Sequence, residues 1–214
     1  MLIAKRMKLN PATADPDMNI TSAANLMKKE GVHRLPVLDK NKKLVGVISE
    51  KNILLAMPSP VTTLSAFEMD YMVGELKVRD VMQKNPVTIT PDFAVEDAAR
   101  LMIDNDLSCL PVLDGERLVG IVSKSDMFKL LLELFGARQF GTRVEFLVED
   151  KPGVILAISR DFSESGCNII SMGTFMGTDA TTAICTMKVQ GASAAQVAEI
   201  LKPHVLEIYE VKEV

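Results

Sequence analysis

Apolar residues gather in short runs that alternate with polar turns and with stretches of helical spacing. Leu35–Leu38 and Leu44–Ile48 are apolar runs of strand length, and the polar segment Asp39–Lys43 joins them. Runs of this kind predict buried strands. Apolar residues in 94–102 recur instead at intervals of three and four, which indicates an amphipathic helix. The pattern predicts a chain of mixed, α+β (α/β-like) class.

The same pattern occurs twice in the first two-thirds of the chain. Residues 10–39 align without gaps with residues 85–114, at an offset of 75, and 14 of these 30 positions are identical. After a length change of one residue, the match resumes between 44–49 and 118–123. A repeat at this spacing predicts two equivalent units, each with a short extended segment, a helix, two strands and a second helix.

Each copy carries a Pro-Asp pair ahead of its first helix, Pro16-Asp17 in one and Pro91-Asp92 in the other. Proline and acidic residues are favoured in the first turn of a helix, so we expect the helices to begin at these pairs. The stretch 58–77 joins the copies as a linker, and a helical run is expected within it.

The last third of the chain has no trace of the repeat. Gly136 marks the boundary, and we expect a separate domain over 139–214. Its apolar segments follow the order βαββαβ, which is typical of a ferredoxin-like half-sandwich. The expected strands cover 144–148, 166–171, 181–189 and 205–211, and the expected helices cover 154–162 and 193–201.

Composition narrows the classes of function. The net charge of −4 argues against a nucleic-acid partner, because no basic face is implied. No apolar run reaches the roughly 18 residues of a membrane span, and the N-terminus has no signal-peptide core, so we expect a cytoplasmic protein without a membrane partner.

Reactive side chains are few. Cys109, Cys167 and Cys185 are far apart and lack zinc-ligand spacing, which favours reduced thiols. With only two histidines, a His-based metal site is not expected. No Ser-His-acid set or Cys-His pair is apparent, so we expect neither an enzyme nor a required cofactor.

Both copies contain Leu-Pro-Val-Leu-Asp, followed by Gly-Val-Ile-Ser-Glu-Lys-Asn at 46–52 and Gly-Ile-Val-Ser-Lys-Ser-Asp at 120–126. This pattern resembles the CBS (cystathionine-β-synthase) domain, whose common lead-in matches Val-Arg-Asp-Val-Met at 78–82. The resemblance assigns 1–57 to a first CBS repeat and 78–133 to a second. Tandem CBS repeats form a pseudo-twofold unit with two clefts, and some members bind adenine nucleotides in them.

The resemblance implies that one cleft combines the Asp126 end of the second repeat with the first strand of the first repeat. Asp126 would hold the ribose hydroxyls. Ser125 at a helix start, together with His33 and Arg34, would hold phosphate. This main nucleotide site is expected to contain Asn10, Ala12, Thr13, Val32, His33, Arg34, Ile121, Ser123, Ser125 and Asp126.

The other cleft departs from the family pattern. Asn52 stands where the family has Asp, and Ser108-Cys109 replaces the basic pair, so we expect weaker binding or an empty cleft. Lys51 is a candidate for a phosphate contact in this cleft. The residues expected here are Val47, Ser49, Lys51, Asn52, Asn85, Val87, Thr88, Leu107, Ser108 and Cys109.

Simpler roles are open for several of these residues. Ser125 and Asp126 could serve only as a helix cap, and the same holds for Asn52. Thr13 and Thr88 could be ordinary strand residues. His33 could be a surface or core histidine.

The segments Asp150-Lys151-Pro152-Gly153 and Gly166-Cys167-Asn168-Ile169 resemble the ACT domain, a ligand-sensing module of amino-acid metabolism. In that family the Asp-x-Pro-Gly loop precedes the first helix, and the Asn-Ile strand faces it across a dimer interface. The implied effector site contains Asp150, Lys151, Pro152, Gly153, Asn168 and Ile169. The alternative is an ACT domain that serves only for dimerisation.

The order CBS–CBS–ACT is similar to that of the acetoin utilization protein family. The sequence therefore predicts a homodimeric, non-catalytic regulator that binds AMP, ADP or ATP as a regulatory ligand, with an amino acid as a second candidate ligand. The alternative is a structural or interaction module whose clefts are empty.

Overall fold

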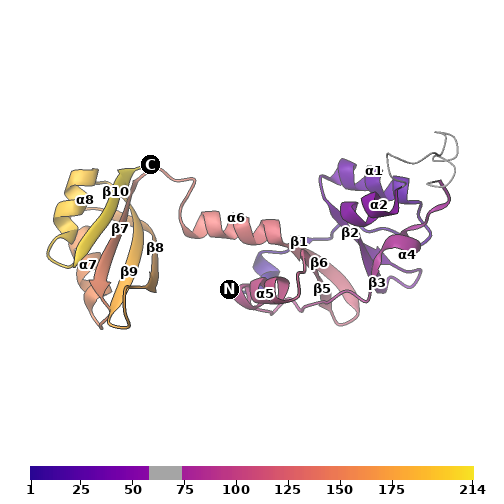
Figure 1. Cartoon of the computed structure of the whole chain (residues 1–214), viewed down its shortest axis with the longest axis horizontal. Helices are drawn as coiled ribbons and strands as arrows, with labels where there is room; N and C mark the ends of the chain where they lie inside the picture. Colours follow the sequence, from indigo (N-terminus) through magenta and orange to yellow (C-terminus); the bar gives the residue numbers. More distant parts are fainter. Residues whose placement is uncertain (58–73) are drawn as a thin grey trace. The chain divides into compact units, whose positions relative to one another are not determined.

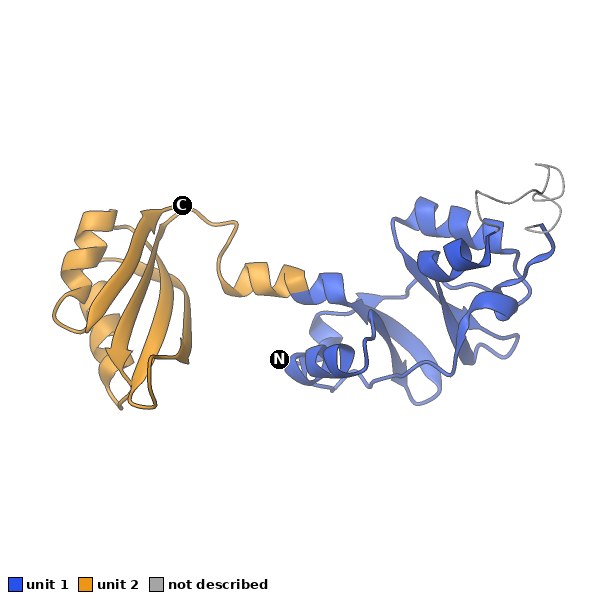
Figure 2. Ribbon diagram, viewed as in Figure 1, with its two compact units in different colours: residues 1–127 blue, residues 128–214 orange. Residues whose placement is uncertain are grey.

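The computed structural model describes residues 1–57 and 74–214, and it divides into two compact units, residues 1–127 and 128–214 (Figure 2). Of the linker 58–77 only residues 74–77 are described, so the helical run expected in it lies mostly outside the described residues. In the described part of the chain, no helix combines the length and hydropathy that crossing a membrane requires.

Unit 1 contains two halves of the same design (Figure 1). The first half consists of α1 (Ile20–Glu30), β2 (Arg34–Leu38), β3 (Leu44–Ser49) and α2 (Glu50–Ala56). The second consists of α5 (Val95–Asp104), β5 (Cys109–Asp114), β6 (Arg117–Ser123) and α6 (Lys124–Leu134), which continues past the unit boundary. The α+β class predicted from the apolar runs is confirmed.

The segment at the start of each repeat completes the sheet of the other repeat. The 3-10 helix η1 (Ile3–Lys5) and β1 (Lys8–Leu9) lead into the first repeat, but β1 pairs with β6, giving the sheet order β1-β6-β5. Likewise α4 (Val78–Val81) and β4 (Gln83–Lys84) lead into the second repeat, but β4 pairs with β3, giving the order β2-β3-β4. The repeats are therefore interlocked through hydrogen bonds in both directions.

The expectation that the first helices begin at Pro16 and Pro91 is wrong. Both α1 and α5 begin later, and the two prolines lie in turns. The carbonyl of Pro16 accepts a hydrogen bond from the N–H of Arg79 at 3.0 Å, and that of Pro91 accepts one from Ala4 at 2.8 Å. These carbonyls hold the exchanged segments, so they do not accept the i+4 bond that an earlier helix start would require.

Gly46 lies where the exchanged segment crosses its sheet. A Cβ at this position would lie 2.5 Å from Met82 Sδ and 2.9 Å from the carbonyl oxygen of Gln83. We predict that Gly46→Ala lowers the free energy of unfolding by about 1–3 kcal/mol through overpacking, measured by urea denaturation. Gly74→Ala is the control, because a Cβ there meets nothing within 4 Å. Equal losses in both variants would contradict the close packing at Gly46.

Unit 2 continues after α6 with six elements in the order βαββαβ. They are β7 (Thr142–Glu149), α7 (Val154–Glu164), β8 (Asn168–Met176), β9 (Thr182–Gln190), α8 (Ala194–Leu201) and β10 (Glu207–Glu213). The strands form one antiparallel sheet in the order β10-β7-β9-β8. This is the predicted ferredoxin-like arrangement, and Ser193 caps α8.

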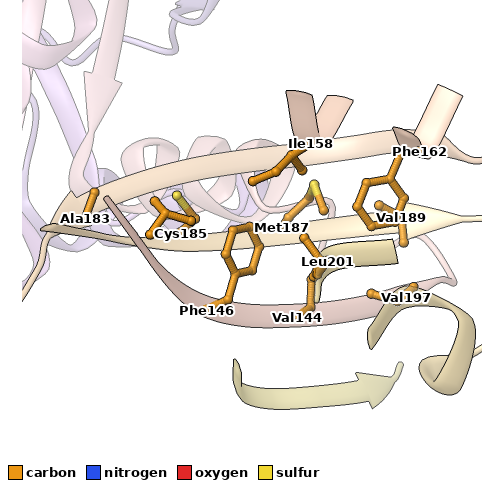
Figure 3. Close-up of a cluster of buried hydrophobic side chains, with 11 residues drawn as sticks. Val144, Phe146, Ile158, Phe162, Ala183, Cys185, Met187, Val189, Val197 and Leu201 are labelled. Atoms are coloured by element: carbon orange, nitrogen blue, oxygen red, sulfur yellow. The ribbon is translucent and has the colours of Figure 1, made fainter. Parts of the chain in front are cut away.

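The core of unit 2 lies between this sheet and its two helices. Side chains from β7 and β9 meet Ile158 and Phe162 of α7 and Val197 and Leu201 of α8 (Figure 3). All four helix residues are fully buried. The strand order leaves β8 and β10 as the two edges of this sheet within the unit.

Candidate functional site

A cavity of about 240 Å³ lies between the two repeats of unit 1. It matches the second predicted cleft: Val47, Ser49, Asn52, Val87, Leu107, Ser108 and Cys109 line it, together with Arg34, Gln83, Pro86, Asn105 and Asp106. Lys51, Asn85 and Thr88 are neighbours in the chain but are not among its lining residues. The exchanged strand β4 therefore contributes directly to the wall through Gln83.

Arg34 lines this cavity, whereas the sequence grouped it with Asp126. It begins β2 and pairs in register with Ser49 on β3, which places it beside the start of α2. Arg34 is half-buried as a residue, and within the described residues its guanidinium has neither a hydrogen bond nor an ion pair. The cavity therefore contains a basic group, Arg34, although Ser108-Cys109 replaces the basic pair of the family pattern in this cleft.

Cys109 faces the same cavity from β5. Burial raises the pKa of the Cys109 thiol, and the nearby Arg34 charge opposes part of that rise. The thiol is therefore neutral at pH 7 and contributes no negative charge to the cavity.

Asn52 caps the helix that begins beside the cavity. Its Oδ1 accepts hydrogen bonds from the backbone N–H of Ser49 at 3.0 Å and from the Ser49 hydroxyl at 2.5 Å, and the Asn52 N–H returns a bond to Ser49 Oγ at 3.2 Å. This reciprocal arrangement is a capping box. The capping role that the sequence left open for Asn52 is therefore present.

Asp126 occupies the equivalent position in the second repeat. Its Oδ2 accepts hydrogen bonds from the backbone N–H of Ser123 at 2.9 Å and from the Ser123 hydroxyl at 2.6 Å. The carboxylate therefore caps α6, and it places negative charge at the helix N-terminus, where the dipole stabilises it. The structure shows this capping role, and ribose binding by Asp126 stays a prediction.

The exchanged strand β1 places the start of the first repeat against β6. Lys8 pairs with Ile121, and the N–H of Asn10 donates to the carbonyl of Val119 at 3.3 Å. Asn10 and its counterpart Asn85 both have positive φ, 45° and 49°, a conformation that asparagine tolerates better than most residues. Of the residues grouped with Asp126, the structure thus brings Asn10 against β6, the strand that carries Ile121, although its hydrogen bond is to Val119.

His33 is held by its own repeat. Its Nδ1 lies 2.8 Å from a carboxylate oxygen of Glu50, and its side chain is 74% exposed. The carbonyl of His33 also accepts from the N–H of Glu50 at 3.1 Å. A phosphate contact by this imidazole would compete with Glu50.

A second cavity, of about 380 Å³, lies in unit 2. The loop after β7 and the β8–β9 hairpin enclose it, and its walls include Asp150, Lys151, Val154 and Cys185. Burial raises the pKa of the Cys185 thiol, and the Asp150 charge raises it further. The predicted effector loop therefore borders a real cavity, although Pro152 and Gly153 are not among its lining residues.

Asn168 and Ile169 lie at the opposite end of β8 from this cavity. They pair with Gln190 and Val189, whereas Met176, which lines the cavity, pairs with Ala183. Within one subunit the two parts of the predicted effector site are thus separated by the length of β8. Only a second copy of the chain could bring them together, as the dimeric prediction requires.

Sequence reasoning missed Gln83, Pro86, Asn105 and Asp106 as cavity residues. Gln83 was missed because the strand exchange was not foreseen. A signal existed, since Gln83-Lys84 immediately precede Asn85 just as Lys8-Leu9 precede Asn10. In the part of the chain that the structure describes, no cluster of three His, Cys, Asp or Glu side chains is suited to a metal ion.

Comparison with known protein families identifies the domains of this chain. The CBS domain model matches residues 3–59 and 78–133, and the ACT domain model matches residues 142–203. The chain belongs to the CBS-domain family and joins a CBS pair to a C-terminal ACT domain.

Three solved structures resemble the CBS pair. A putative acetoin utilization protein (AcuB) from Vibrio cholerae is 25% identical, with a TM-score of 0.54 over 64% of this chain and 95% of that one. CBSX2 in complex with AMP is 27% identical, with a TM-score of 0.52 over 62% and 97%. The CBS pair of protein MJ0100, in complex with 5-methylthioadenosine and S-adenosyl-L-methionine, is 27% identical, with a TM-score of 0.52 over 65% and 98%.

Proposed function

We propose that this chain is a non-catalytic regulator that binds an adenine nucleotide of the AMP, ADP or ATP type in the clefts of its CBS pair. The observation that carries the proposal is the polar cavity between the repeats, at the place of the second predicted cleft, for which the sequence predicts the weaker binding. The likeness to CBS pairs described with AMP and with adenosine-containing ligands supports it. Binding would be signalled to a partner protein rather than lead to chemical turnover.

The ACT domain has two candidate roles under this proposal, dimerisation and amino-acid sensing. The cavity beside Asp150 and Lys151 supports a small-molecule site. The open edge of β8 supports pairing with a second copy, because exposed strand edges tend to be covered. The three free cysteines suit a reducing, cytoplasmic location.

A thermal-shift screen of the full-length chain tests the proposed function. The panel contains AMP, ADP, ATP, adenosine, S-adenosylmethionine and the twenty amino acids. A ligand at 100 times its dissociation constant stabilises the folded state by about 2.7 kcal/mol, so the adenine nucleotides should raise the melting temperature in a concentration-dependent way. The absence of a shift with every adenosine compound would favour the structural-module alternative.

We predict that the full-length chain is a dimer or a multiple of one, measured by light scattering during size-exclusion chromatography. Removal of residues 137–214 should weaken this association, because it deletes the whole sheet with its open β8 edge. A full-length protein that stays monomeric at high micromolar concentration would refute the prediction.

A further inference from the structure

A cavity of about 450 Å³ lies on the face of the unit 2 sheet opposite α7 and α8. Successive side chains of a strand point to opposite faces of its sheet. Cys185, Met187 and Val189 of β9 belong to the core beneath the two helices. Thr186 and Lys188 alternate with them, so they point to the other face, where both line the cavity. The lining residues of this cavity and of the 380 Å³ cavity are different.

Lys188 contributes a buried positive charge with unused donors. It is 5% exposed, and its Nζ donates to the carbonyl of Gly136 at 3.1 Å. An ammonium group has three N–H donors, and within the described residues the Gly136 carbonyl is its one acceptor. A buried charge is costly unless it is paired and hydrogen-bonded, so Lys188 is suited to bind an anionic oxygen in the cavity.

Ser171 and Thr186 add neutral donors beside this lysine. Ser171 on β8 pairs in register with Lys188, and directly opposite residues of antiparallel strands have Cβ atoms about 5 Å apart on one face. Thr186 lies on the same face, two residues before Lys188 on β9. Neither hydroxyl has a hydrogen-bond partner within the described residues. The lysine and the serine together can donate to both oxygens of a carboxylate.

Glu145 contributes the opposite charge to the same cavity. It lies on β7 in register with Thr186, which makes it the diagonal neighbour of Lys188. Its carboxylate has no partner within the described residues, whereas Glu210 is held by Arg143 at 2.6 Å. Diagonal neighbours on paired strands lie about 7–8 Å apart, which is the span of a small molecule with one hydrogen bond at each end.

We propose that this cavity binds a small carboxylate whose adjacent carbon carries a hydrogen-bond donor, either a hydroxyl or an ammonium group. The carboxylate of the ligand contacts Lys188 Nζ and Ser171 Oγ, and its donor contacts the Glu145 carboxylate. This inference rests on the small-molecule role proposed for the ACT domain. It assigns the ligand to the open face of the sheet, however, and not to the loop at 150–153.

Amide-resolved NMR titration of the full-length chain tests the site with three ligands of one carbon skeleton. L-Lactate carries a hydroxyl on the adjacent carbon, L-alanine carries an ammonium group there, and propionate carries only hydrogen. Lactate or alanine should shift the amide signals of Ser171, Thr186 and Lys188 in a saturable way. The preferred ligand should bind about tenfold or more tightly than propionate, because propionate leaves Glu145 unpaired. Which of the two is preferred identifies the donor.

Variants separate a binding role from a structural one. Lys188→Met removes the ammonium and should weaken binding of the preferred ligand about tenfold or more. Ser171→Ala leaves Lys188 and the turn after α6 in place, so it tests the site even if Lys188→Met does not fold, and the expected loss is about threefold or more. Glu145→Gln should remove most of the preference over propionate. Lys212→Met is the matched control and should leave binding unchanged, because Lys212 pairs with Arg143 on the same sheet face but is not among the lining residues.

The contradicting results are equally specific. No saturable shift at the β8 and β9 amides with lactate and alanine at millimolar concentration would overturn the site, as would equal affinity for propionate or undiminished binding in Ser171→Ala. Shifts confined to the loop at 150–153 would also overturn it, but they would keep the small-molecule role of the ACT domain. Nucleotide-induced thermal shifts report on the CBS pair separately, so failure of this site and failure of the proposed function are distinguishable.

Discussion

Phe162→Ala is expected to lower the free energy of unfolding of unit 2 by about 3–5 kcal/mol, the usual cost of removing a buried phenylalanine. Phe162 is 0% exposed and projects from α7 into the core formed with β7, β9 and α8 (Figure 3). Since a domain of this size has only about 5–15 kcal/mol of stability in total, a large part of it would be lost.

Differential scanning calorimetry of the full-length chain provides the measurement. The transition of unit 2 should move to lower temperature, and that of unit 1 should keep its position, because the two compact units have separate cores. Phe140→Ala is the matched control, since that phenylalanine is 85% exposed and its loss should change stability by less than about 0.5 kcal/mol. A single transition that shifts as a whole would contradict two separately stabilised units.

Asp126→Asn is expected to reduce the affinity for adenosine and for AMP by about tenfold or more. If Asp126 accepts the ribose hydroxyls, the variant loses charge-assisted hydrogen bonds worth roughly 1.5–3 kcal/mol. The fold should be preserved, because Asn52 shows that an amide oxygen in this position can cap the helix through the equivalent serine. Asp126→Ala should lose the cap as well, at a further cost of about 0.5–2 kcal/mol in stability.

Isothermal titration calorimetry with adenosine isolates the Asp126 cleft, since adenosine has no phosphate for Arg34. Arg34→Gln is the control, and it should leave adenosine affinity unchanged. If Asp126→Asn binds adenosine as well as the wild type does, the carboxylate has only its capping role, and the ribose assignment is refuted.

Most of the strands and helices that the sequence could predict were identified from apolar runs. Leu35–Leu38 and Leu44–Ile48 are strands β2 and β3 because a buried strand leaves a continuous apolar signal. Apolar patterns also predicted both repeats and the six elements of unit 2. The exchanged strands β1 and β4 left no such signal, since each has only two residues and these are exposed.

Arg34 shows why the candidate site was only partly predictable. The sequence predicted that Arg34 lines a cleft. Which cleft it lines depends on how β2 pairs with β3 and how β4 completes the sheet, and the local sequence does not show this. Lys188 is a second example. A lysine in a strand normally faces solvent, yet this one is buried and donates to the carbonyl of Gly136 at 3.1 Å. In both cases, contacts between segments that are distant in the sequence determine what surrounds the side chain.

Equilibrium dialysis of the full-length chain against labelled AMP, followed by chromatography of the recovered label, tests the central claim most directly. It measures binding and chemical fate in one experiment. The regulatory account predicts saturable retention of AMP, with all of the label recovered as unchanged AMP. Label converted to another compound would contradict a non-catalytic protein, and no retention at millimolar AMP would contradict a nucleotide-binding one.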